Sequence, residues 1–315
     1  MIITTTEGKP VKQYFVPAGE AAIWVTEQGN PEHPTLLFVH GFPDDHRVWS
    51  AVIEQLENDY HILTLDLRGA GNSTRPEDRS AYRIERVIPD FAAVMDHVVP
   101  GKPVHLVGHD WGSTLCWSFV SDPQLASRLA SYTSLSGPHV GLLWQWINQQ
   151  VRSASISGMQ KALAQLSHSW YIFAFHIPKL PETLFTRFGT KLWPFAMKQG
   201  GVPEDDDYLE HSENDIRSVT LDTIELYRQN AFKPPPVPAP GSIQVPVQLV
   251  LLQQDPFIRP YIFENLEQYV PNLTRRTLDS NHWAPRSHPQ QVAQLIDRHV
   301  KSVAKRKKDN ASNAA

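Results

Sequence analysis

Cysteine and long apolar runs are almost absent from this sequence. Cys116 is the single cysteine among 315 residues, which excludes an intrachain disulfide and a zinc site built from cysteines. No stretch approaches the run of about 18 apolar residues that a membrane span requires. The first residues, MIITTTEGKPVKQY, do not have the basic and then apolar layout of a signal peptide. We therefore expect a soluble, cytoplasmic protein with no membrane span.

Charge of neither sign dominates the chain. The sequence has 29 Lys and Arg against 33 Asp and Glu, a formal net charge of −4. Proteins that bind nucleic acid usually carry a clustered basic face, and this balance gives no electrostatic reason to expect one. We expect no nucleic-acid partner.

Proline and aromatic residues are frequent instead. The 26 prolines exceed the roughly 5% of average usage. They are joined by 13 phenylalanines, nine tryptophans and nine tyrosines. A hydrophobic share of 41% is typical of a globular chain. At about 150 residues per domain, the length predicts roughly two structural units.

The first part of the chain alternates between strand and helix patterns. Short apolar runs rich in β-branched and aromatic residues predict buried strands at Ala21–Thr26, Thr35–Val39, His61–Leu65, Pro103–Val107 and Leu129–Leu135. Helical spacing of apolar residues lies between them, at Arg47–Leu56, Arg83–Val98 and Ser113–Val120. This alternation predicts an α/β fold with a mostly parallel sheet that is covered by helices on both faces.

The alternation stops near Pro138. From Val140 to about Ala231 the chain has Trp- and Phe-rich helical pieces and no convincing strand, and the proline-rich stretch Phe232–Ser242 follows. The pattern then resumes, at Val245–Leu252, Tyr261–Tyr269, Leu273–Leu278 and a helix from Pro289 to about Val303. We predict a core at 1–138 and 233–304, an inserted helical cap at 139–232, and a disordered basic tail at 305–315.

The stretch Val104–Ser113, VHLVGHDWGS, carries the most chemical information. An apolar strand runs into Gly108-His109-Asp110-Trp111-Gly112 and a helix pattern follows, the context of a nucleophile elbow G-x-S-x-G with aspartate in place of serine. The alternative is a plain turn in which Asp110 caps the next helix.

An aspartate at the elbow changes the reaction that the site supports. With a reference pKa of about 3.9, an aspartate is ionised at neutral pH and needs no base to activate it. Its attack on a saturated carbon leaves an ester, which water can hydrolyse, whereas serine would leave an ether. Asp110 therefore indicates displacement at carbon followed by ester hydrolysis.

An acid and a histidine are expected to follow the nucleophile in the chain. Asp255 comes directly after an apolar strand, in QQDPF, and His282 lies in SNHWAP before the last helix. His282 would act as general base on water, with Asp255 holding its orientation. A turn-forming Asp-Pro and an ordinary histidine are the alternatives, and Asp279 and Glu264 are weaker candidates for the acid.

The segment His40-Gly41-Phe42-Pro43 follows the strand Thr35–Val39. A loop at this place can direct the backbone N–H of Phe42 at the same point as that of Trp111, which together would form an oxyanion hole. A simple turn built from Gly and Pro is the alternative.

Taken together, these motifs resemble the epoxide hydrolase branch of the α/β-hydrolase fold family. The matching pieces are spread from about residue 20 to 300: HGFP at 40–43, DLRGAGNS at 66–73, VGHDWGS at 107–113, QDPF at 254–257 and HWAPRSHP at 282–289. One departure is Asn281, where the family often has glycine before the histidine. The resemblance implies a helical cap in the region where the strand pattern lapses.

The resemblance also implies that two cap tyrosines donate a proton to the opening epoxide. Tyr171 lies in a matching W-Y-x-x-F context and Tyr227 in a context close to Y-R-N. Phenols, with a reference pKa near 10, are protonated donors at neutral pH. Both could instead be ordinary core tyrosines among nine.

Two further patterns are weak. Gly69-Ala70-Gly71 lacks the third glycine of a dinucleotide fingerprint, and the acidic run Glu204–Asp207 lacks the ligand spacing of a calcium loop. We expect no metal and no organic cofactor.

These features predict a cofactor-independent epoxide hydrolase that converts an apolar epoxide and water to a vicinal diol through an aspartyl ester. The expected pocket includes Phe42, Trp111 and Phe175. A haloalkane dehalogenase with the same Asp-His-Asp set and a non-catalytic ligand-binding homologue remain as alternatives, and a homodimer is one assembly left open.

Overall fold

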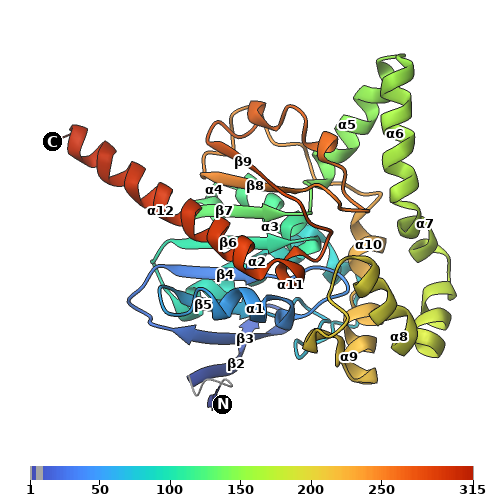
Figure 1. Cartoon of the computed structure of the whole chain (residues 1–315), viewed down its shortest axis with the longest axis horizontal. Coiled ribbons are helices and arrows are strands. Elements are labelled where there is room, and N and C mark those ends of the chain that lie inside the picture. Colours follow the sequence, from blue (N-terminus) through green and yellow to red (C-terminus); the bar gives the residue numbers. More distant parts are fainter. Residues whose placement is uncertain (1, 5–9, 315) are drawn as a thin grey trace.

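The computed structural model describes residues 2–4 and 10–314, and its centre is a sheet of nine strands (Figure 1). Their order across the sheet is β1-β2-β3-β5-β4-β6-β7-β8-β9. The pairs that involve β1, β2 and β3 are antiparallel, and β5-β4-β6-β7-β8-β9 are parallel. The bounds are β1 (Ile2–Thr4), β2 (Pro10–Ala18), β3 (Ala21–Gly29), β4 (Thr35–Val39), β5 (His61–Leu65), β6 (Val104–His109), β7 (Leu129–Leu135), β8 (Val247–Leu252) and β9 (Leu273–Leu278).

Helices cover both faces of this sheet. Alternate strand residues point to opposite faces. Leu37 and Val39 of β4 share one hydrophobic core with α2 (Ile84–Val98) and α3 (Trp111–Ser121), whereas Leu36 and Phe38 share the other with α1 (Ser50–Glu54) and α12 (Pro289–Ala314). Burial on both faces explains why β4 is almost entirely apolar, and β5, β6 and β7 are buried along their whole length although they include Ser, Thr or His. Two short helices, α4 (Pro123–Ala126) and α11 (Ala284–Ser287), complete this layer structure.

A group of helices lies between β7 and β8 in the chain and covers one edge of the sheet, on the right in Figure 1. Its members are α5 (Val140–Arg152), α6 (Ile156–His168), α7 (Trp170–His176), α8 (Leu180–Gln199), α9 (Glu213–Arg217) and α10 (Glu225–Asn230), with a 3₁₀ turn at Asp207–Leu209 and a π turn at Ser218–Asp222. The α/β fold with a parallel sheet and an inserted helical cap is thus confirmed.

Three parts of the chain differ from the sequence-based expectation. At the start of the chain, β1 and β2 were not predicted. The segment Tyr261–Tyr269, predicted as part of the strand–helix alternation, forms only 3₁₀ turns at Pro260–Phe263 and Leu266–Gln268. The tail 305–315 was predicted to be disordered, yet α12 continues through it to Ala314. Its Lys, Arg and Ala residues have high helix propensity and the tail contains no Gly or Pro, which explains the extension.

Candidate active site

Four loops at the carboxyl edge of the parallel strands bring the predicted residues together. Phe42 follows β4, Asp110 follows β6, Asp255 follows β8 and His282 follows β9. Since parallel strands end at the same edge of a sheet, residues that are far apart in the sequence become neighbours there. Asp110, predicted as the nucleophile, lies at the centre of this group.

Asp110 occupies a sharp turn between β6 and α3. Its φ of 52° and ψ of −123° are unusual for a residue that carries a side chain. The surrounding chain comes so close that a Cβ atom added at Gly41 would overlap the Asp110 side chain, and one at Gly137 would overlap the Asp110 carbonyl oxygen. The two glycines therefore let the backbone hold the carboxylate at the floor of the site.

His282 lies between the two predicted carboxylates. Its Nδ1 is 2.9 Å from Asp255 Oδ2, and its Nε2 is 3.5 Å from Asp110 Oδ2. Asp255 is fixed in turn, because its Oδ1 accepts hydrogen bonds from the backbone N–H groups of Phe257 and Ile258 at 2.7 and 3.0 Å. The arrangement orients the imidazole with one nitrogen toward the nucleophile.

The two weaker candidates for the acid lie elsewhere. The Asp279 carboxylate is exposed and accepts a hydrogen bond from Gln254, and Glu264 forms an ion pair with Lys161 at 2.9 Å. Asp255 is the candidate acid that contacts His282.

Burial and two neighbouring carboxylates act in opposite directions on the charge of His282. Burial lowers the pKa of the imidazole, while Asp255 and Asp110 raise it, and the carboxylates prevail to give a pKa of about 10. Burial and a charged neighbour also oppose each other at Asp255. Burial raises the pKa of this carboxyl, but the contact with His282 brings it below the usual value. With both carboxylates charged, His282 is therefore protonated at neutral pH.

One of the two predicted oxyanion donors contacts Asp110 directly. The backbone N–H of Phe42 donates to Asp110 Oδ1 at 2.8 Å. Trp111 is the first residue of α3 and follows Asp110 in the chain, but among the described residues its N–H makes no hydrogen bond to that carboxylate. The backbone N–H of Phe42 thus holds Oδ1 of Asp110, while Oδ2 faces His282.

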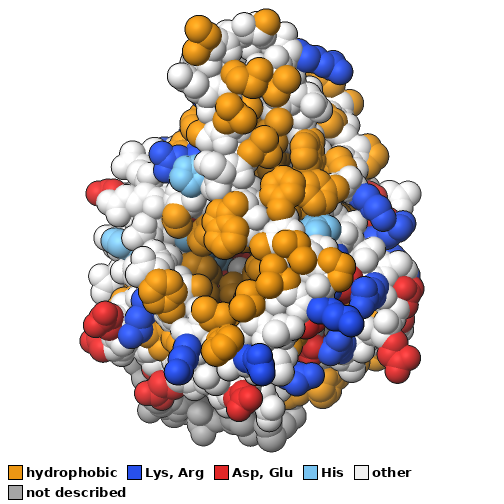
Figure 2. All heavy atoms as spheres, turned by 90° about the vertical axis from the view of Figure 1, so that its right-hand side faces the viewer, with side chains coloured by type: hydrophobic (Ala, Val, Ile, Leu, Met, Phe, Trp, Pro, Cys, Tyr) orange, Lys and Arg blue, Asp and Glu red, His pale blue; other side chains and the backbone are white. Residues whose placement is uncertain are grey.

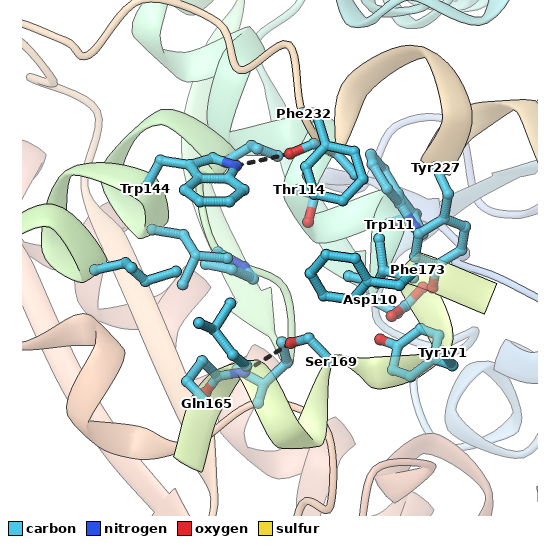
Figure 3. A pocket seen from close by; sticks show the side chains of 18 of the residues that line it. Asp110, Trp111, Thr114, Trp144, Gln165, Ser169, Tyr171, Phe173, Tyr227 and Phe232 are labelled. Carbon is cyan, nitrogen blue, oxygen red and sulfur yellow. Dashed lines mark hydrogen bonds between the residues drawn. The ribbon is translucent and has the colours of Figure 1, made fainter. Parts of the chain in front are cut away.

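The two predicted cap tyrosines meet above the carboxylate. Tyr171 comes from α7 and Tyr227 from α10, and their ring centroids are 5.8 Å apart. Figure 3 shows both rings beside Asp110 at one end of a cavity. Burial raises the pKa of both phenols, the negative charge of Asp110 adds to this, and the two hydroxyls stay protonated at neutral pH.

Two apolar cavities join at these three residues. Asp110, Tyr171 and Tyr227 line both of them. The first, shown in Figure 3, extends beneath α5 and α6 and has few polar side chains on its wall, among them Thr114, Gln165 and Ser169. The second extends toward α8. The predicted pocket residues divide between the two, since Trp111 lines the first, and Phe42 and Phe175 line the second.

A buried polar network behind His282 was not predicted from the sequence. The side chain of His109 donates from Nε2 to the backbone oxygen of His282 at 2.9 Å, and its Nδ1 is 3.7 Å from Asp44 Oδ2. Asp44 Oδ1 accepts from Tyr208 Oη at 2.8 Å and from Trp283 Nε1 at 2.9 Å. Burial raises the pKa of Asp44, but His109, Trp283 and Tyr208 outweigh burial and lower it. The sequence signal for this network was weak: His109 lies within the motif at 107–113, and Asp44 directly follows the motif at 40–43.

The described part of the chain contains no group of three or more His, Cys, Asp or Glu side chains arranged to hold a metal ion. None of its helices is long and apolar enough to cross a membrane.

Comparisons with known proteins agree with this architecture. Residues 34–289 match the alpha/beta hydrolase fold family. The chain is 34% identical over 282 residues to the probable oxidoreductase EphD of Mycobacterium tuberculosis; the match covers 87% of this chain and 47% of that protein, so the chain spans about half of its length. It is 26% identical to epoxide hydrolase 3 of Mus musculus, with 85% of this chain and 71% of that protein covered.

Among solved structures, the Bacillus megaterium epoxide hydrolase in complex with an inhibitor has a similar fold. The TM-score is 0.74 at 21% sequence identity, and the match covers 91% of this chain and 100% of that one. The family match extends over most of the chain and includes strands β4 to β9, the aspartate elbow and the histidine loop. The chain therefore belongs to the α/β-hydrolase fold family.

Proposed function

We propose that the chain is an epoxide hydrolase that opens an apolar epoxide to a vicinal diol through an ester on Asp110. One observation carries the proposal: the elbow carboxylate faces two protonated phenols on one side and a His–Asp pair on the other. This combination supplies a nucleophile, a proton for the departing oxygen and a base for the second step.

In the first step, Asp110 Oδ2 attacks one epoxide carbon. A carbon–oxygen bond forms to the carboxylate, and the epoxide carbon–oxygen bond breaks with its electron pair on the oxygen. Tyr171 or Tyr227 gives its phenolic proton to that oxygen. The products are a hydroxyalkyl ester of Asp110 and one tyrosinate, which the protonated His282 can neutralise with its own proton.

Ester formation prepares the second step. The ester has no negative charge, so one of the two carboxylates that raise the pKa of His282 is lost. Neutral His282 then takes a proton from water, and the resulting hydroxide attacks the ester carbonyl. The backbone N–H of Phe42, with that of Trp111, stabilises the oxyanion. Collapse of this intermediate releases the diol alkoxide, which takes a proton from His282, and leaves Asp110 as a carboxylic acid. Transfer of that acid proton to His282 restores the Asp110 carboxylate and protonated His282.

The walls of the two cavities support an apolar substrate. The reacting carboxylate lies where the cavities join, so a substrate can extend apolar groups from the epoxide ring in either direction. Residues of both cavities are mostly aliphatic and aromatic, and charged side chains other than the reacting group and His282 are absent from the wall residues described.

The tyrosine pair distinguishes this proposal from a haloalkane dehalogenase. Displacement of halide leaves a stable anion that needs no proton, so two buried phenols beside Asp110 would have no task there. A non-catalytic binding protein would need neither the His282–Asp255 contact nor the strained elbow. The cytoplasmic location and the state of assembly stay predictions.

Product analysis tests the proposed reaction. Diol formation from styrene oxide is measured beside halide release from bromoalkanes, with Asp110→Ala as the inactive control. We expect diol from the wild type, and a loss of diol formation when both Tyr171→Phe and Tyr227→Phe are introduced. Halide release without diol formation would support the dehalogenase instead, and saturable epoxide binding without turnover would support the binding protein.

A further inference from the structure

The outer surface of the cap has an unusual concentration of exposed apolar side chains. We call six of them the cap apolar surface; they come from α7, the turn after it and α8, and comprise Trp170, Ile177, Leu184, Phe188, Leu192 and Phe195. Trp170 is 67% exposed and Phe195 63% exposed, although side chains of this size are usually at least half buried. In Figure 2, apolar side chains gather on this face around a hollow, and charged side chains of both signs border them.

This surface surrounds the mouth of the second cavity. Trp170, Leu184, Leu192 and Phe195 are exposed to solvent and also line the cavity that leads to Asp110. The apolar wall of the cavity is therefore continuous with the outer apolar surface. An apolar molecule could pass from outside to Asp110 with contact to apolar side chains throughout.

The basic residues of α8 lie along one edge of the apolar stripe. Residues three or four apart share one face of a helix, which places Leu184, Phe188, Leu192 and Phe195 together. Arg187, Lys191 and Lys198 are four and seven residues apart, one and two helical turns, and form the adjacent row. All three are exposed and have no ion-pair partner within residues 2–4 and 10–314. Helices with this layout lie in the interface of a membrane, with the apolar face among the acyl chains.

Positive charge is concentrated in the part of the chain that carries the cap apolar surface. Residues 140–200, which form α5 to α8, contain six Lys and Arg and only one Asp or Glu, a net charge of +5. The rest of the chain contains 23 Lys and Arg and 32 Asp and Glu, a net charge of −9. The single acid, Glu182, forms an ion pair with Arg228 at 2.7 Å. A field of this sign attracts an anionic surface to α5–α8 and repels it from the rest of the molecule, which includes the acidic second part of the cap at 201–232.

We propose that the cap apolar surface and the basic row of α8 bind the surface of an anionic lipid membrane, with the mouth of the cavity facing the lipid. A second copy of the chain is the less suitable occupant. A two-fold symmetric dimer would place the same surface on both sides of the interface, and two segments of charge +5 would meet. Binding to lipid does not depend on the reaction at Asp110, so no substrate is needed to test it.

The test is sedimentation of the full chain with vesicles. Vesicles of phosphatidylcholine with phosphatidylglycerol are compared with phosphatidylcholine alone, at low salt and at about 0.5 M salt, where charge interactions are strongly screened. We expect binding to the anionic vesicles, weaker binding at high salt, and little binding to neutral vesicles. The double variant Arg187→Glu, Lys191→Glu and the single variant Phe188→Glu should each lower the partition coefficient about tenfold or more.

The basic tail provides a matched control. Lys305 and Lys307 are exposed on α12 and lie far from the cap in the chain, so the double variant Lys305→Glu, Lys307→Glu reverses the same charge elsewhere. It should retain binding, and thermal unfolding shows that each variant is folded. The proposal is overturned if the wild type does not prefer anionic vesicles, or if only the tail variant loses binding. It is also overturned if Phe188→Glu instead abolishes a dimer that forms without vesicles.

Discussion

At the scale of single residues, the charge of His282 depends on the state of Asp110. Asp255 lies 2.9 Å and Asp110 3.5 Å from the two imidazole nitrogens, and both raise the pKa of His282 against burial. While Asp110 is charged, His282 is protonated and therefore cannot take a proton from water. In the proposed mechanism, the same histidine becomes a base once the nucleophile has reacted. The order of the two proposed steps is thus built into one contact.

The substitution Asp110→Asn should lower the pKa of His282 below its wild-type value of about 10. The amide removes one negative charge and leaves a group of similar size, so the protonated imidazole loses part of its stabilisation. Titration of the His282 ring nitrogens by NMR measures the change. Asp279→Asn, which alters an exposed carboxylate bonded to Gln254, should leave that titration unchanged. An unchanged pKa in Asp110→Asn would contradict the coupling.

A second prediction concerns the fate of the ester. Without the imidazole, Asp110 can still attack an epoxide, but no base activates water for the second step. His282→Gln should therefore slow turnover by about 100-fold or more and accumulate protein whose mass is increased by that of the epoxide. Intact-protein mass spectrometry detects the adduct. A slow His282→Gln enzyme that stays unmodified with excess epoxide would show that the imidazole is needed before the ester forms.

At the scale of elements, the strand–turn–helix unit around Asp110 is held by close backbone approach. A Cβ at Gly137 would overlap the carbonyl oxygen of Asp110, whereas one at Gly189 within α8 would make only an ordinary contact with Ile216. Gly137→Ala must move the elbow, and Gly189→Ala replaces a poor helix former with a good one.

Gly137→Ala should accordingly lower the free energy of unfolding by about 1–3 kcal/mol and reduce kcat, because relief of the overlap displaces the nucleophile. Gly189→Ala serves as the matched control, with unchanged or slightly increased stability. Thermal unfolding and steady-state kinetics measure both effects. Equal stabilities for the two variants would indicate an elbow that accommodates a side chain freely.

Which elements were predictable follows from how each is stabilised. β4, β5, β6 and β7 are buried on both faces, so the apolar and β-branched residues concentrated in them were visible in the sequence. β2 alternates between exposed and buried residues and contains two prolines, which obscured the strand pattern. The basic and polar composition of the end of α12 predicts disorder, but intrinsic helix propensity decides the conformation of such an exposed segment.

The site was predictable to a similar degree. Asp110, Asp255 and His282 each follow a strand within a recognisable motif, and parallel strands bring such positions together. The placement of Tyr171 and Tyr227 rested on family resemblance, because nothing local in a cap helix says which residue will face the core. The network of Asp44, His109 and Tyr208 depends on contacts between segments distant in the sequence, and these could not be derived without the fold.

At the scale of the whole molecule, cap and core are joined by buried hydrogen bonds that end near the site. Tyr208 from the cap donates to Asp44, and Trp193 of α8 donates to the backbone oxygen of Pro43 at 2.9 Å. On the other side of the cap, Asn230 of α10 accepts from the backbone N–H of Ile84. Hydrogen bonds therefore connect the cap to the loop that contains Phe42 and to the network behind His282, so a shift of the cap would also move these parts.

Tyr208→Phe tests this connection. The change removes one donor from a fully buried carboxylate, which should cost about 1–3 kcal/mol of the free energy of unfolding. Since Asp44 also faces His109, we expect a several-fold lower kcat with little change in KM, because the pocket walls remain intact. Urea unfolding and steady-state kinetics provide the two measurements. A lower stability with unchanged kcat would show that the network stabilises the fold and has no effect on catalysis.

The central claim is the covalent ester on Asp110, and one single-turnover experiment in ¹⁸O-labelled water tests it most directly. With enzyme in excess over epoxide, the new oxygen of the first diol should come from the Asp110 carboxylate, so the diol is unlabelled and the label enters the protein at Asp110. Mass spectrometry of the diol and of the peptide that contains Asp110 measures both. Labelled diol in the first turnover, with an unlabelled peptide, would show that water attacks the epoxide directly and would contradict the account.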